Sequence, residues 1–163
     1  MQGNIKSAMK IQSVRYNNRR KSFEVKTSRQ SFMFPYVKAD PQPMSANLVA
    51  DACVDDELGR EGFSYVLKSG REGTVHIDQI LEYNQDPSYM RNRLLYKLTL
   101  EAQKRVKSTS LSKREIIRRL GTSAAQFYRV LDPANYRKST DQLLFLLHVL
   151  DCDVELVVRA KNA

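Results

Sequence analysis

Residues 123–132 carry side chains that could read DNA bases if the segment forms a helix. Ala125, Tyr128 and Arg129 would then face outward, and Gln126 would lie near the leading end of the helix. An arginine can fork onto guanine O6 and N7 or clamp a phosphate, and a glutamine can pair with adenine N6 and N7. Ala125 offers only a methyl group to thymine, so specificity would also depend on DNA shape.

Basic residues on both sides of this segment could bind phosphates. The candidate phosphate contacts are Lys113, Arg114, Arg118, Arg119, Ser123, Arg137 and Lys138. Arg137 and Lys138 precede a predicted helix, where backbone N–H groups and side chains could meet one phosphate. Arg118 and Arg119 are adjacent, so we expect them to point in different directions. Ser123 has a competing role as a helix cap.

The order of capping and apolar residues predicts two short helices that position these side chains. Ser112 can accept a free backbone N–H at the start of the first helix, and Glu115 completes a capping box. Gly121 ends that helix, because glycine takes the left-handed conformation without steric cost. The second helix, expected over about 123–132, turns these apolar side chains inward: Phe127, Val130 and Leu131. The pattern is that of a helix-turn-helix, although two packed helices joined by a glycine turn would look similar.

Residues 111–131 resemble the helix-turn-helix of the Cro/λ-repressor-like (XRE) regulators. The turn glycine of that family matches Gly121, and its apolar positions match Ile116, Leu120, Phe127 and Val130. The chain departs from the family at two positions. Ile117 stands where the family usually has alanine, and Lys113 replaces its usual glutamine. The resemblance implies a helical domain that binds duplex DNA, as a homodimer.

Three further stretches, residues 14–20, 62–65 and 72–78, extend a resemblance over nearly the whole chain. Together they look like a small bacterial family of uncharacterised two-domain proteins. In that family a β-rich domain of unknown function precedes a λ-repressor-like helical domain, and no activity comes with the likeness. Related β domains occur in proteins suspected of toxin–antitoxin roles. The alternative is therefore a protein-interaction module, or an antitoxin-like partner binder, with a degenerate helix-turn-helix.

The positive charge is concentrated in the second half of the chain. The formal net charge is +9 over 163 residues, which favours a polyanionic partner. Residues 91–163 hold 15 Lys/Arg against 7 Asp/Glu, whereas residues 1–90 hold 12 against 11. The excess charge thus accompanies the predicted helix-turn-helix and indicates double-stranded DNA as the partner.

The fold class expected is α+β, with a small antiparallel β domain over 1–87 and an all-α helix-turn-helix domain over 88–163. Alternating apolar residues predict strands within 10–38, 48–54, 63–67 and 75–77. Pro35 cannot donate to a β ladder and should lie at a sheet edge. Asp78 is expected to cap a short helix that carries Ile80 and Leu81. The role of this β domain is unknown, and a protein partner could bind there.

Helical spacing predicts a long helix from residue 88 to about 107. Its buried positions should be Leu94, Leu95, Leu98, Ala102 and Val106. A last helix over about 143–150 has leucine on nearly every side and should be widely buried, in its own bundle or against a second subunit. The β-branched end, residues 154–158, predicts a C-terminal strand that pairs with its own β domain or with a twin chain.

No catalytic or metal-binding constellation is predicted. His76 and Asp78 are expected on one face of a strand near Glu82, which more often marks a hydrogen-bonded group than a general base. His148 lies in a leucine-rich helix. The acidic residues of 51–61 could bind a basic partner, but they lack calcium-loop spacing. The sequence therefore predicts no enzyme, no cofactor and no metal.

Cysteine usage and hydropathy bear on the compartment. Cys53 and Cys152 match no metal or redox spacing, and each should be a small core residue. The N-terminal ten residues lack a secretory apolar run, and no stretch approaches membrane-spanning length. We therefore expect a cytoplasmic protein that does not enter a membrane.

Overall fold

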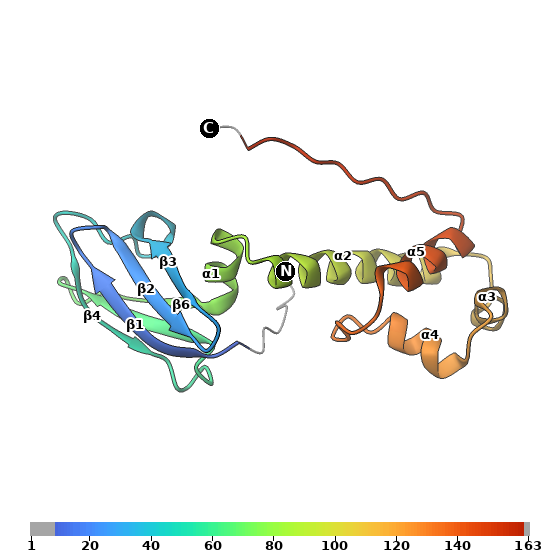
Figure 1. Cartoon of the computed structure of the whole chain (residues 1–163), viewed down its shortest axis with the longest axis horizontal. Helices are drawn as coiled ribbons and strands as arrows, with labels where there is room; N and C mark the ends of the chain where they lie inside the picture. The colour runs from blue at the N-terminus through green and yellow to red at the C-terminus, as the bar shows by residue number, and fades with distance from the viewer. Residues whose placement is uncertain (1–8, 162–163) are drawn as a thin grey trace. The chain divides into compact units, whose positions relative to one another are not determined.

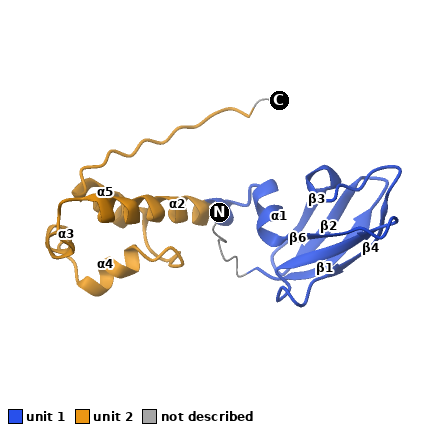
Figure 2. Cartoon of the chain, turned by 180° about the vertical axis from the view of Figure 1, so that it is seen from behind, with its two compact units in different colours: residues 1–90 blue, residues 91–163 orange. Residues whose placement is uncertain are grey.

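The computed structural model describes residues 9–161 and has a mixed α+β fold (Figure 1). It divides the chain into two compact units, residues 1–90 (unit 1) and 91–163 (unit 2), as Figure 2 shows. The N-terminal stretch in which no secretory leader was expected lies mostly outside the described residues. In residues 9–161, no helix is both long and apolar enough to cross a membrane.

The first sheet of unit 1 is an antiparallel meander in the order β1-β2-β3. Its strands are β1 (Ile11–Asn17), β2 (Ser22–Thr27) and β3 (Ser31–Pro35), followed by the short 3-10 helix η1 (Tyr36–Lys38). Phe23 and Val25 are buried and their neighbours Glu24 and Lys26 are exposed, which confirms the predicted alternation. Pro35 ends the edge strand β3, where a missing N–H breaks no ladder.

The second sheet has the order β4-β5-β6 and is also antiparallel. Its strands are β4 (Val49–Val54), β5 (Gly62–Leu67) and β6 (Glu72–His76). Phe23 packs its ring 4.8 Å from that of Phe63 and 5.0 Å from that of Tyr65, so the two sheets share an aromatic core. The regular alternation expected over 48–54 is wrong, because the register shifts between Val49 and Asp51 and leaves Ala50 exposed.

Gly73 and Tyr65 form a close cross-strand pair between β6 and β5. A Cβ atom on Gly73 would collide with the Tyr65 ring, so only glycine fits there. The Tyr65 hydroxyl donates to the Pro41 carbonyl at 2.6 Å. Burial raises the pKa of Tyr65 to about 12, so this hydroxyl keeps its proton at neutral pH. The pair therefore ties the loop after η1 to the second sheet.

Helix α1 (Ile77–Tyr83) is capped by His76, and not by Asp78 as expected. The His76 Nδ1 accepts the Asp78 N–H at 3.2 Å, and the Gln79 Oε1 accepts the His76 N–H at 2.8 Å. His76 and Asp78 therefore do not share a strand face, because the helix begins between them. Burial raises the pKa of Asp78. Ile77, Ile80 and Leu81 are buried.

Four helices meet in unit 2: α2 (Pro87–Ser108), which begins in unit 1, α3 (Lys113–Leu120), α4 (Ala124–Val130) and α5 (Thr140–Val149). Their shared core contains Leu95, Ala102, Ile116, Phe127, Val130, Leu143, Leu146, Leu147 and Leu150. The prediction for Leu94 is wrong: that side chain is 52% exposed. Thr99 is buried instead, because its hydroxyl donates to the Leu95 carbonyl at 2.6 Å and needs no water.

Two apolar segments expected to be covered are exposed in the single chain. Leu144 and Phe145 on α5 are 40% and 48% exposed, so this helix is not buried on every side. The predicted strand over 154–158 does not pair with the β domain of its own chain within residues 9–161, so pairing with a twin chain stays a prediction. Leu156 and Val158 are more than four-fifths exposed.

The two cysteines have different surroundings. Cys53 is exposed on β4, so its expected place in the core is wrong. The register shift earlier in that strand decides which of its side chains point inward. Cys152 is half-buried and packs against the core of unit 2, in line with its expected apolar surroundings.

Candidate nucleic-acid interface

A left-handed glycine separates α3 from α4. Ser112 caps α3 by accepting the Glu115 N–H at 3.1 Å, and Ser123 caps α4 by accepting the Gln126 N–H at 3.1 Å. Gly121 between them has φ 63°, a conformation that side chains disfavour. The capping box predicted for α3 is only half formed, because the Glu115 carboxylate turns to arginines instead of the Ser112 backbone. The local capping chemistry thus fixes the start of both helices.

Helix α4 turns an apolar face inward and a polar face outward. Phe127 and Val130 are buried, while Tyr128 is 53% exposed. Ala125 and Arg129 are also exposed, and Gln126 is half-buried. The Arg129 guanidinium has no hydrogen bond or ion pair with any of the described residues. This face therefore has the shape and chemistry to meet a partner.

Three other candidate cations differ in their surroundings. Lys113 lies close to the outer face of α4, with its Nζ 5.8 Å from the centre of the Tyr128 ring. Arg114 and Arg137 are exposed, and neither guanidinium is paired within residues 9–161.

Ser123 is exposed, and its hydroxyl accepts the Gln126 N–H as a helix cap. The cap uses an acceptor position of this hydroxyl and leaves its O–H able to donate, so a phosphate contact by Ser123 stays a prediction.

Arg118 and Arg119 converge on one carboxylate, contrary to the expectation that they diverge. Arg118 donates from Nη2 to the Glu115 Oε1 at 2.6 Å and from Nε to Oε2 at 2.9 Å. Arg119 donates from Nε to the same Oε1 at 2.9 Å. The two arginines lie three and four residues after Glu115, which are the two helical spacings that reach it. Part of their charge is thus neutralised within α3.

We expect Glu115 to titrate well below an ordinary glutamate. Hydrogen bonds from Arg118 and then Arg119 lower its pKa from 4.5 to about 2, because they stabilise the charged form. The stability that this triad contributes is therefore complete above pH 4.5 and is lost as the pH falls through about 2. An NMR titration of the Glu115 side-chain carbon measures this midpoint. In a variant with Arg118→Ala and Arg119→Ala the midpoint should return toward 4.5. A wild-type midpoint already near that value would contradict the triad.

Lys138 is not available to a phosphate, which corrects its predicted role. It is 3% exposed, and its Nζ donates to the Val130 carbonyl at 2.9 Å and to the Asp132 carbonyl at 2.7 Å. Burial lowers its pKa. The carbonyls at the end of a helix lack intrahelical partners. Here the Lys138 ammonium donates to these carbonyls, so it is a structural cation at the C-terminal end of α4.

Two more side chains complete this end of α4. Asn135 donates from Nδ2 to the Arg129 carbonyl at 3.0 Å, and Gln103 of α2 donates from Nε2 to the Leu131 carbonyl at 2.8 Å. With Lys138, they bind four successive carbonyls of residues 129–132. Sequence reasoning missed this arrangement. Its one local signal is Pro133, which has no N–H to offer these carbonyls.

Comparison of the chain with protein-family models, with curated proteins and with solved structures gave no match. The site is therefore defined by its own geometry.

The acidic segment of unit 1 is internally paired at several points. Glu61 binds Lys10 at 2.8 Å, and Asp56 binds Arg60 at 3.3 Å. In residues 9–161, no group of three or more His, Cys, Asp or Glu side chains is arranged to hold a metal. His76 has its Nε2 3.8 Å from Glu61, and His148 is exposed on α5.

Proposed function

We propose that this protein binds duplex DNA in a sequence-specific manner through α4 and regulates transcription. In this proposal unit 2 is a λ-repressor-like helix-turn-helix domain, and unit 1 is a β domain of separate role, as in the two-domain bacterial family that the sequence resembles. The protein works in the cytoplasm without a cofactor and catalyses no reaction. The DNA-recognition helix is α4, within the segment 123–132.

The outer face of α4 is the observation that carries the proposal. Tyr128 is half exposed and Arg129 has no side-chain partner in the described part of the chain, and both lie on a helix whose opposite side packs in the core. A helix in the major groove needs these properties: a rigid inner face and polar side chains free to meet base edges. The lysine over the Tyr128 ring, Lys113, adds a cation beside this face.

Within this proposal the side chains have separate tasks. Arg129 and Gln126 make the hydrogen bonds to bases, while Ala125 and Tyr128 make apolar contacts. Lys113, Arg114 and Arg137 bind phosphates. Arg118 and Arg119 contribute less, because Glu115 holds both guanidinium groups. Two copies of the chain would place their α4 helices about 34 Å apart, one turn of DNA.

A binding measurement at two salt concentrations tests the proposal. The full chain is titrated with duplex DNA from upstream of its own coding region and with a scrambled duplex of the same length. We expect tighter binding to the first, and a logarithm of affinity that falls with the logarithm of salt by about 0.9 for each phosphate contact. Equal affinity for both duplexes, or binding without salt dependence, would remove the proposed function.

Protein binding is the second candidate function, because apolar side chains stay exposed on unit 2. Leu144 and Phe145 lie on α5, and Leu156 and Val158 lie in the extended tail. A surface of this kind is typical of interaction modules, among them antitoxin-like partner binders. The two functions are separated by the arginine variants considered in the Discussion.

A further inference from the structure

We propose that unit 1 has a binding site for a small organic carboxylate with a compact apolar body. The site is a cavity of about 330 Å³ between the β1–β2 turn, η1 and the loop that follows η1. It lies within the range of volumes typical of small-molecule pockets. The proposal concerns unit 1 alone and does not depend on DNA binding by unit 2.

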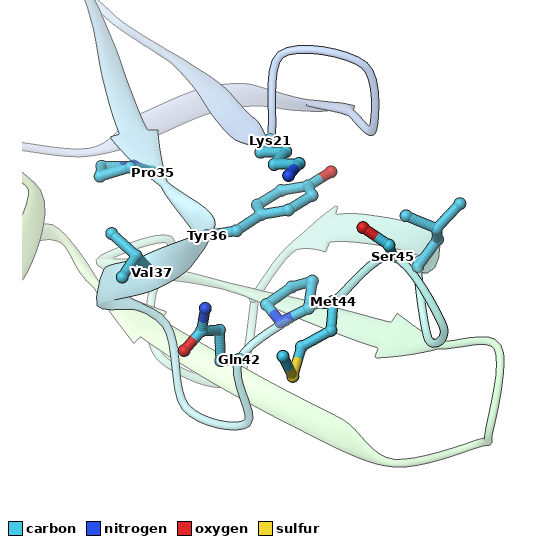
Figure 3. A pocket seen from close by; sticks show the side chains of 9 residues that line it. Lys21, Pro35, Tyr36, Val37, Gln42, Met44 and Ser45 are labelled. Atoms are coloured by element: carbon cyan, nitrogen blue, oxygen red, sulfur yellow. The ribbon is translucent and has the colours of Figure 1, made fainter.

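Most of the cavity wall is apolar. Figure 3 shows Tyr36 and Lys21 on one side and Gln42 and Met44 on the other. The apolar lining residues are Pro35, Tyr36, Val37, Pro43, Met44 and Leu48. Val37 and Met44 are 64% and 61% exposed, so the single chain leaves large apolar side chains facing water at this site. A ligand with an apolar body would remove that surface from water.

Three exposed polar side chains that line the cavity have no protein partner within residues 9–161. These are the Lys21 ammonium, the Gln42 amide and the Ser45 hydroxyl, none of which makes a hydrogen bond or ion pair there. All three can donate to a carboxylate, and Lys21 also supplies the opposite charge. The residues 18–22 and 36–40 that flank the cavity include three more cations and one acid: Arg19, Arg20, Lys38 and Asp40. The local charge therefore favours an anion over a cation or a neutral molecule.

Backbone and side-chain hydrogen bonds hold the cavity walls in place. Lys21 accepts the Tyr36 N–H on its carbonyl at 2.9 Å, which joins the turn to η1. Asn18 accepts the Tyr36 hydroxyl at 3.0 Å and pairs with both backbone groups of Val49. Met44 and Asn47 close the loop with a pair of backbone bonds.

Burial raises the pKa of Tyr36 to about 12, so its ring stays neutral beside an anion. The backbone of the walls is thus fixed in the free chain, which lowers the entropy lost there on binding. The exposed Lys21, Gln42 and Ser45 side chains become ordered only when a ligand binds.

The test uses sodium benzoate and benzamide, which have the same size and differ in charge. The full chain is labelled with ¹⁵N and titrated with each, and backbone shifts are followed by NMR. We expect benzoate to move resonances of Lys21 and of residues 35–48 with a Kd near 1 mM, so that about 10 mM is close to saturating. Benzamide should bind up to about fivefold more weakly, as expected for the loss of one exposed ion pair.

Three variants separate a binding role of Lys21 from a structural one. Lys21→Met should weaken benzoate by about fivefold and leave benzamide unchanged, whereas Lys21→Arg should retain benzoate binding. Lys26→Met, at an exposed position on β2 outside the cavity, is the matched control and should bind benzoate as the wild type does. The proposal is overturned if benzoate gives no shifts by about 10 mM. It is equally overturned if benzamide binds as well as benzoate, or if Lys21→Met has no effect.

Discussion

A chain that carries Arg129→Ala and Arg114→Ala is expected to bind its specific duplex about 100-fold more weakly than the wild type, since a base-reading arginine alone discriminates by 10- to 100-fold. Arg129 is a cation on the outer face of α4 whose guanidinium has no partner among residues 9–161, and Arg114 is an exposed cation of α3. The slope of log affinity against log salt should also become shallower by about 0.9 for each phosphate-binding side chain that the substitutions remove. Fluorescence anisotropy with labelled DNA at several salt concentrations measures both quantities.

The matched control removes two exposed cations from unit 1, through Arg15→Ala and Lys26→Ala. It has the same net charge as the test variant and should bind specific DNA within about twofold of the wild type. An equal loss of affinity in both variants would mean that only total charge matters, which contradicts base reading by α4. If the test variant keeps a protein partner while DNA binding was weak from the start, the interaction-module function is supported instead.

Lys138→Met is expected to destabilise unit 2 by about 1 to 3 kcal/mol, because it leaves the Val130 carbonyl at the end of α4 without a donor. The Asp132 carbonyl, which Lys138 also binds, keeps the Asn135 N–H at 3.1 Å. Methionine keeps most of the side-chain volume, so the change reports the missing hydrogen bonds and not a cavity. Urea unfolding followed by circular dichroism measures the change in the free energy of unfolding.

Lys97→Met is the control, since Lys97 is an exposed lysine of α2 and its replacement should change stability by less than about 0.5 kcal/mol. If the Lys138 ammonium holds the end of α4, its loss should have a second effect, on DNA binding. The loosened end of α4 should weaken DNA binding even at temperatures where the Lys138→Met chain remains folded. A variant as stable as the control would show that the Lys138 ammonium does not support α4.

Local patterns predicted the elements whose cause is local. The alternation around Phe23 and Val25 gave the strands of the first sheet, because each pattern needs only one buried face. Ser112 and Gly121 gave the limits of α3 and Ser123 gave the start of α4, because capping is decided within four residues. The end of α4 lies at Val130, short of the expected residue 132. The shared carboxylate of Glu115 also had a local signal in the two arginines that follow it by three and four positions.

The features that the sequence could not reveal depend on contacts between distant segments or on residue types that are uncommon in their positions. Gln103 reaches the end of α4 from another helix, and no pattern within either segment indicates this pair. The register shift between Val49 and Asp51 puts Val49, Ala52 and Val54 on the inward side of β4, and Cys53 between the last two is exposed. His76 takes the place expected for Asp78 as the helix cap, because its ring nitrogen accepts the Asp78 N–H and the helix already begins at Ile77. Similarly, Thr99 is buried because its own helix satisfies its hydroxyl.

The contact between Gly73 and Tyr65 has a consequence for how this chain tolerates change. The ring that leaves no room for a Cβ atom is the same ring that anchors Pro41. A substitution of Gly73 on the edge strand β6 would displace the Tyr65 ring. It would thereby loosen the loop at Pro41, more than thirty positions earlier in the chain. Natural variants that alter Gly73 should persist only alongside a smaller residue at position 65, so the two sites are expected to evolve as a pair.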